Sequence, residues 1–133
     1  MDTNVLSEPL LPAPNPQVLG RLRDNQDEVA IASMVWHELL FGCHRLPRSV
    51  RRAAIEEYLN EVVAPSIPVL PYDARAAEWH AAERARLTGA GRTPPFADGQ
   101  IAATAKVNDL ILVTANLTDY AAFRDIQVVD WRA

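Results

Sequence analysis

Residues 110–114 form a nearly continuous apolar run of strand length, Leu-Ile-Leu-Val-Thr. Strands covered on both faces, as in parallel sheets, have this composition, whereas strands exposed on one face alternate apolar with polar residues. Asn116 and Asp119 follow the run within a few residues. The run therefore predicts a central strand of a parallel sheet, with polar side chains beyond its carboxyl end.

Residues 29–32 form a shorter apolar run, residues 65–71 contain a brief proline-bounded strand with Ile67, Val69 and Leu70, and residues 126–129 are predicted as a last strand. Between the runs, apolar residues recur with helical spacing. The predicted helices cover residues 16–23, 33–43, 49–63, 73–87 and 96–105, with Ser33 and Asp73 as expected N-terminal caps. Because strands alternate with helices, we predict a three-layer α/β/α sandwich with a mostly parallel sheet, as a single domain over residues 1–133.

Composition excludes several classes of protein. Hydrophobic residues make up 49% of the chain, enough to form a core, and the lone Cys43 excludes an internal disulfide. The sequence contains no apolar run long enough to span a membrane, and we expect a cytoplasmic location. Thirteen basic and 17 acidic residues give a net charge of −4, which argues against non-specific binding of nucleic acid through a broad positive surface.

Asp98 is the polar exception on an otherwise apolar helix face. Pro94 and Pro95 prevent a helix before it, and Ile101, Ala102 and Ala105 follow at helical spacing. An acid in this place has two interpretations. It caps the helix and complements the helix dipole, or it belongs to a site formed with other acids.

Other acids occupy matching positions. Asp119 follows the predicted central strand, Glu38 lies early in the helix after residues 29–32, and Asp2 would end a first strand. Sites in open α/β sheets form where strands end, so these acids are expected to converge. Two carboxylates about 5 Å apart repel by roughly 3 kcal/mol at an effective dielectric constant near 20. A divalent cation removes this repulsion, and carboxylates without Cys or a His cluster suit Mg²⁺ or Mn²⁺.

In their order along the chain, these acidic motifs resemble those of PIN-domain ribonucleases, in particular the VapC-like toxins of bacterial type II toxin–antitoxin systems. The resemblance covers essentially the whole sequence. The segments that carry it are residues 2–7, 36–39 with Gly42, 98–105 and 112–120.

The resemblance implies a role for each acid. Asp2 and Asp98 correspond to the principal Mg²⁺ ligands, and Glu38 and Asp119 complete the catalytic site directly or through water. Thr114 and Asn116 would support these acids without binding the metal themselves. The implied activity is endonucleolytic hydrolysis of RNA, such as the loops of tRNA, by one or two metal ions. The implied partners are an antitoxin protein and a second copy of the chain.

The sequence departs from this family at two places. Relatives usually carry several apolar residues, which form a central first strand, before the first Asp, whereas here Met1 alone precedes Asp2. Either the start of the chain lies further upstream, or the first strand is truncated or absent. Ala115 stands where relatives often have Arg, which removes a positive charge near the substrate.

Arginines account for twelve of the thirteen basic residues. One cluster has two interpretations, a solvated face or a contact surface for RNA phosphates: Arg45, Arg48, Arg51 and Arg52. A second group could flank the site on its other side: Arg84, Arg86 and Arg92. His37, His44 and His80 lack metal-ligand spacing and are predicted to be structural or exposed.

Two alternatives to a ribonuclease stay open. The first is a degenerate PIN-like domain without nuclease activity, because the first strand is missing. The second is another α/β binding module, for example a receiver-like domain. The receiver fits poorly, since it requires a Lys near its end and the only Lys here, Lys106, lies in the helix that begins near Asp98.

Overall fold

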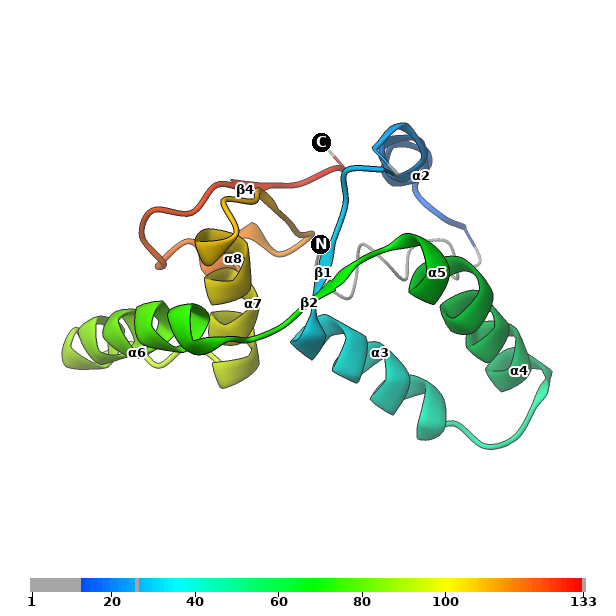
Figure 1. Cartoon of the computed structure of the whole chain (residues 1–133), viewed down its shortest axis with the longest axis horizontal. Helices are drawn as coiled ribbons and strands as arrows, with labels where there is room; N and C mark the ends of the chain where they lie inside the picture. Colours follow the sequence, from blue (N-terminus) through cyan, green and yellow to red (C-terminus); the bar gives the residue numbers. More distant parts are fainter. Residues whose placement is uncertain (1–12, 26, 133) are drawn as a thin grey trace.

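The computed structural model describes residues 13–25 and 27–132. In this part of the chain, helices alternate with short strands (Figure 1). The helices are α2 (Pro16–Asp24), α3 (Ser33–His44), α4 (Val50–Glu57), the π-helical segment η2 (Tyr58–Val63), α5 (Ala64–Ser66), α6 (Ala74–Gly89), α7 (Phe96–Val107) and α8 (Leu117–Tyr120). The strands are β1 (Ile31–Ala32), β2 (Val69–Leu70), β3 (Leu112–Val113) and β4 (Val128–Val129).

All four strands pair in parallel, as predicted, but in two separate pairs. In one pair Ile31 of β1 lies opposite Val69 of β2. In the other, Leu112 of β3 lies opposite Val128 of β4. Residues 110–114 were predicted as a central strand, yet among the residues described β3 is paired only with β4. Each strand is also shorter than its apolar run, because hydrogen-bonded pairing covers only two residues of it.

A cavity of about 460 Å³ lies between the two strand pairs. Residues 28–32 line it on the side of β1, and residues 109–113 line it on the side of β3. Ile101 and Ala105 of α7 also face it, and Trp131 contributes beyond β4. The described strands therefore leave a cavity of mixed apolar and polar lining between β1 and β3.

The helices flank the strands on two sides (Figure 1). α6 packs against α7 on one side, while α3 and the continuous helical stretch from α4 through η2 to α5 lie on the other. None of the helices in the described ranges is long and apolar enough to cross a membrane.

Side chains fix where several helices begin. Asn15 Oδ1 accepts hydrogen bonds from the backbone N–H groups of Gln17 and Val18, and Pro16 opens α2. Asp73 Oδ1 accepts from the Ala76 N–H at 2.9 Å, which confirms Asp73 as the cap of α6. The prediction that Ser33 caps α3 was wrong. Ala32 holds the cap position, without a side-chain bond, because the helix starts directly at the end of β1.

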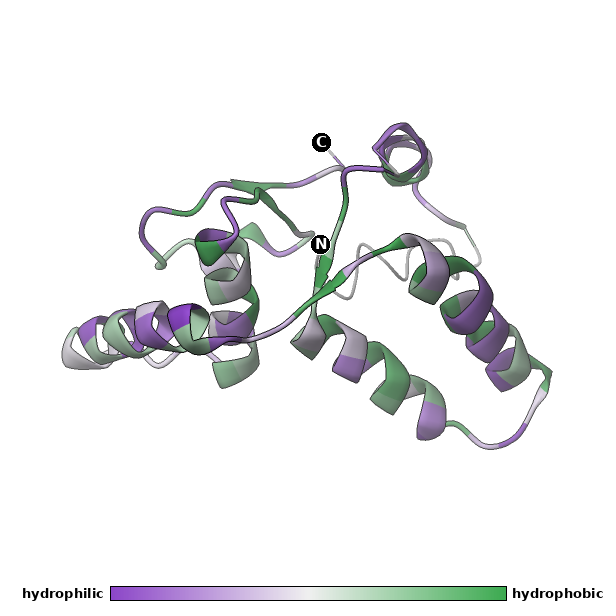
Figure 2. Ribbon diagram, viewed as in Figure 1, coloured by the Kyte–Doolittle hydropathy of each residue, from purple (hydrophilic) through white to green (hydrophobic). Residues whose placement is uncertain are grey.

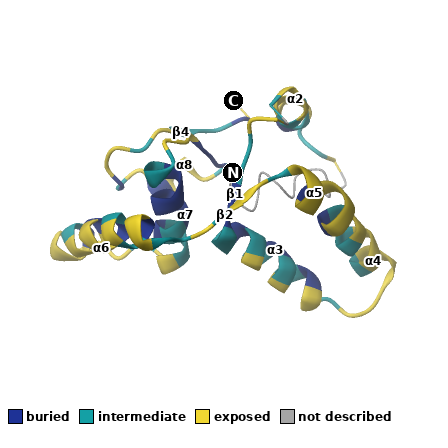
Figure 3. Cartoon of the chain, in the orientation of Figure 1, coloured by how far each residue is buried: buried dark blue, intermediate teal, exposed yellow. Residues whose placement is uncertain are grey.

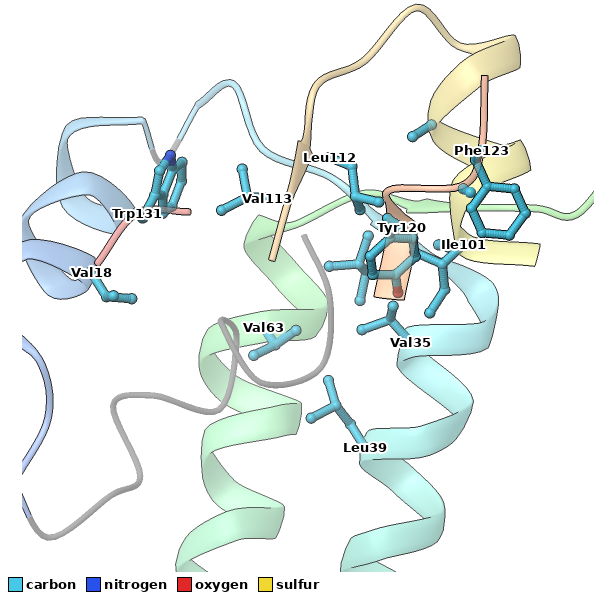
Figure 4. Packing of buried hydrophobic residues seen from close by; sticks show 14 of the residues in the cluster. Val18, Val35, Leu39, Val63, Ile101, Leu112, Val113, Tyr120, Phe123 and Trp131 are labelled. Carbon is cyan, nitrogen blue, oxygen red and sulfur yellow. The ribbon is translucent and has the colours of Figure 1, made fainter. Parts of the chain in front are cut away.

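The core follows the apolar faces of the helices (Figures 2 and 3). Val35 and Leu39 of α3 face Val63 of η2, and Ile101, Leu112 and Tyr120 pack together around α7 and β3 (Figure 4). Val35 and Val63 are fully buried. This packing fixes the rotation of α3 and α7 about their axes, and with it the direction in which their acids point.

Candidate active site

Asp98 lies in the first turn of α7. Pro95 holds the cap position and Phe96 is the first helical residue, so Asp98 is the third residue of the helix and is half-buried. The interpretation of Asp98 as the helix cap is therefore wrong. The carboxylate still lies in the first turn of α7, close to the positive end of the helix dipole.

A buried histidine holds this turn in place. A Cβ atom on residue 99 would overlap the imidazole of His80, so only glycine lets the two helices approach this closely. His80 is 3% exposed, and its Nδ1 lies 2.8 Å from the Tyr72 hydroxyl in a hydrogen bond. Burial, and after it the charge of Arg84, lowers the pKa of His80, which favours the neutral ring.

His80 was predicted to be structural or exposed, and its burial confirms a structural role. The contact of His80 with the turn that carries Asp98 was not predicted. The one signal that could have revealed this contact is the glycine at position 99, directly after the acid in a helix of otherwise small apolar residues.

Glu38 is the sixth residue of α3, and α3 starts where β1 ends. Its neighbours Val35 and Leu39 are buried, which leaves Glu38 half-buried at the border of the packed face. The carboxylate is therefore held on a helix whose rotation the core fixes.

Asp119 is placed by a local hydrogen-bonded turn after β3. Thr114 is fully buried, and its N–H donates to the Val129 carbonyl at 3.0 Å. Its Oγ1 accepts from the Asn116 N–H at 3.0 Å, and the Asn116 carbonyl in turn accepts from the Asp119 N–H at 3.1 Å. Thr114 and Asn116 thus connect the end of β3 to Asp119 at the start of α8.

α7 brings the helices that carry these acids together. It contacts α3, which holds Glu38, and α8, which holds Asp119. Within residues 13–25 and 27–132, no three acidic, His or Cys side chains gather closely enough to hold a metal ion. Asp2, the remaining predicted ligand, lies outside the described residues. The oxygen donors of these acids are of the type that Mg²⁺ or Mn²⁺ prefers.

A guanidinium lies beside Ala115, the position at which the sequence lacks an expected positive charge. Arg132 Nη2 donates to the Ala115 carbonyl at 2.8 Å and to Asp130 Oδ2 at 2.9 Å. The hydrogen bonds from Arg132 lower the pKa of Asp130. Sequence reasoning missed Arg132 because it follows β4, not β3, and only the pairing of these strands places it here.

Some of the arginines predicted to contact RNA are hydrogen-bonded within the protein, and others are exposed to solvent. Arg52 donates to Glu56 Oε1 at 2.8 Å and to the Leu46 carbonyl at 3.1 Å, so it stabilises its own helix region. Arg45, Arg48 and Arg51 are exposed. Of the second group, Arg86 is engaged with Glu83, whereas Arg84 and Arg92 are exposed.

Three features of this structure are typical of one class of protein. The strands are parallel, helices flank them, and the helices that carry Glu38 and Asp119 both contact α7, which carries Asp98. The family model of the PIN domain matches residues 1–125, and the chain belongs to the PIN-domain family.

Within that family the chain is similar to VapC-type toxins. It is 32% identical to Toxin FitB of Neisseria gonorrhoeae, over 92% of this chain and 90% of that protein. It is 31% identical to the tRNA(fMet)-specific endonuclease VapC of Shigella flexneri, over 98% of this chain and 96% of that protein. The crystal structure of FitAcB from Neisseria gonorrhoeae matches with a TM-score of 0.89 and 32% identity, covering 98% of this chain and 95% of that one. Toxin–antitoxin complexes of the VapBC and FitAB types are among the similar structures.

Proposed function

We propose that this protein is a metal-dependent endoribonuclease that acts as the toxin of a toxin–antitoxin pair. The observation that carries the proposal is the contact of α7, the helix of Asp98, with both α3 and α8, the helices of Glu38 and Asp119. The names of the relatives, a toxin and an RNA endonuclease, support the same function. They do not favour a degenerate binding module.

In this proposal Asp98 and Asp2 hold Mg²⁺, with Mn²⁺ as a substitute, and Glu38 and Asp119 complete the site. When bound, the metal polarises the phosphate and lowers the pKa of a water molecule. Glu38 or Asp119 would accept a hydrogen bond from the attacking water and orient it, and the hydrogen bonds of Thr114 and Asn116 hold the turn that carries Asp119. The substrate class is RNA with accessible loops, tRNA included, because protein readout of RNA sequence acts on unstacked bases.

The proposed partner is a small antitoxin protein that blocks this site, as expected from the toxin–antitoxin complexes among the similar structures. We further propose that the protein acts in the cytoplasm as a homodimer.

The test is cleavage of total RNA by the purified chain with Mg²⁺, with Mn²⁺ and with excess chelator. We expect cleavage with either metal and none with chelator. Asp98→Asn should lower the rate about 100-fold or more, since even groups that only support metal ligands contribute about 10- to 100-fold. Glu38→Gln and Asp119→Asn should each lower it by about 10-fold or more.

Asp27→Asn is the matched control, because Asp27 is an exposed acid in a loop away from these helices. It should cleave like the wild type. Full cleavage by Asp98→Asn would contradict the site. Undiminished cleavage in chelator would contradict the metal.

A further inference from the structure

An aromatic ring stands exposed on α3 one turn beyond Glu38. Phe41 is 58% exposed, although it is a large apolar side chain. Its ring is parallel to that of His37 within 7°, with centroids 6.3 Å apart, and the Arg45 guanidinium carbon lies 5.5 Å from its centroid. The three side chains form a ridge of flat groups along α3, which we call the α3 ridge.

Helical spacing connects this ridge to the acid. Glu38, Phe41 and Arg45 occupy positions i, i+3 and i+7, so they share one side of α3. At about 1.5 Å of rise per residue, Phe41 lies roughly 5 Å along the helix axis from Glu38. A nucleotide next to a phosphate held at the acids is within reach of the Phe41 ring.

We propose that the α3 ridge binds single-stranded RNA by stacking a base on Phe41, while Arg45 contacts the adjacent phosphate. This inference rests on the proposed ribonuclease function and adds the surface that holds the substrate beside the cleaved bond. Any base can stack on an aromatic ring. The α3 ridge therefore increases the affinity for RNA and positions the strand, but it does not distinguish one base sequence from another.

The charge around Phe41 favours RNA as the occupant over an apolar protein surface. Arg45, Arg48 and Arg51 are exposed near this end of α3 and the start of α4. Within the described ranges none of these three arginines forms an ion pair, whereas Arg52 pairs with Glu56. Exposed arginines beside a flat ring are the combination that single-strand binding sites use.

The experiment measures binding in the full chain carrying Asp98→Asn, so that the RNA stays intact. Two fluorescent probes are used. The first is a single-stranded RNA of 10 nucleotides, and the second, the baseless probe, has the same sugar-phosphate backbone but lacks the bases of its central nucleotides. Fluorescence anisotropy is recorded over a series of salt concentrations. The variants added to this background are Phe41→Ala, Phe41→Leu, Phe41→Trp, Arg45→Ala and, as an exposed apolar control on η2, Val62→Ala.

Phe41→Ala should weaken binding of the base-bearing RNA about tenfold, leave its salt dependence unchanged and leave the baseless probe unaffected. Phe41→Trp should restore affinity, because it restores an aromatic face, and Phe41→Leu should not. Arg45→Ala should weaken both probes and reduce the salt slope by about 0.7, the value for one phosphate contact on a single strand. Val62→Ala should match its parent.

Equal affinity of Phe41→Ala and its parent for RNA would overturn the inference. So would full affinity in Phe41→Leu, since that result identifies an apolar contact without stacking. If Phe41→Ala keeps its RNA affinity but no longer binds a co-expressed antitoxin or a second copy of the chain, the ridge is a protein interface and the inference also fails. If the wild-type chain neither binds nor cleaves RNA, the proposed function itself fails. Cleavage by the wild type with no role for Phe41 overturns only this inference.

Discussion

At the scale of single residues, Gly99 is a point of especially close contact between α6 and α7. The missing side chain lets the His80 ring lie against the first turn of α7, directly beside Asp98. A buried ring in close contact with a backbone leaves little room for adjustment, because protein interiors are close-packed.

Gly99→Ala is therefore expected to destabilise the fold by about 1–3 kcal/mol, as overpacking does, and to lower RNA cleavage by displacing Asp98. In a His80→Ala background the same change should cost less, because the added methyl group then meets space instead of the ring. A double-mutant cycle of urea unfolding measures this coupling.

Gly42→Ala is the matched control on α3, since nothing lies within 4 Å of the Cβ that it adds. It should stabilise the protein by about 0.5–1 kcal/mol, the ordinary gain from Ala over Gly inside a helix. Equal costs of Gly99→Ala with and without His80 would show that the ring does not constrain residue 99.

At the scale of elements, Glu83 and Arg86 attach α6 to the loop that follows α8. Glu83 is 7% exposed and accepts two bonds of 2.8 Å from the Arg86 guanidinium, and one of 2.7 Å from the Arg124 N–H. Arg86 also donates to the Ala122 carbonyl at 2.9 Å. The hydrogen bond from Arg86 is the main reason that the pKa of Glu83 falls below its ordinary value of 4.5.

Because the folded state lowers this pKa, the ion pair stabilises the protein fully above pH 4.5 and loses its effect as the pH falls through the lower folded value. Glu83→Gln should therefore cost about 1–3 kcal/mol at pH 7, and the difference from the wild type should shrink below pH 4.5. Urea unfolding at pH 7, 5 and 3.5 tests this. Glu57→Gln, an exposed acid on α4, should show no such change with pH.

Element positions could be predicted from the sequence, whereas contacts between elements could not. The apolar runs at residues 29–32 and 110–114 contain the buried strands β1 and β3, because burial favours a continuous apolar pattern, and residues 126–129 contain the half-buried strand β4. The π-helical turn of η2 was not predicted, since it has no sequence signature distinct from the helix around it. The contacts of His80 with Gly99 and of Glu83 with Arg124 join segments that are far apart in the sequence. The spacing of residues along the chain therefore does not predict them.

Some parts of the candidate site could likewise be predicted from the sequence, and others could not. The elements that carry Glu38, Asp98 and Asp119 could be predicted, because acids after strands and at helix starts are visible in the sequence. The part that Arg132 takes beside Ala115 could not, because it depends on the pairing of β3 with β4.

At the scale of the whole molecule, the two strand pairs are separated by the cavity between β1 and β3. Its lining combines apolar side chains such as Ile31 and Leu112 with polar ones such as Arg21, Glu28 and Asp109, so the cavity offers both apolar and hydrogen-bonding contacts.

Asp119 lies between β3 and β4, and the turn that holds it is fastened through Thr114 to Val129. During translation, the strand pair that supports this acid cannot form until the ribosome has added Val129. The turn that carries Asp119 therefore gains this support only when nearly the whole chain has been made.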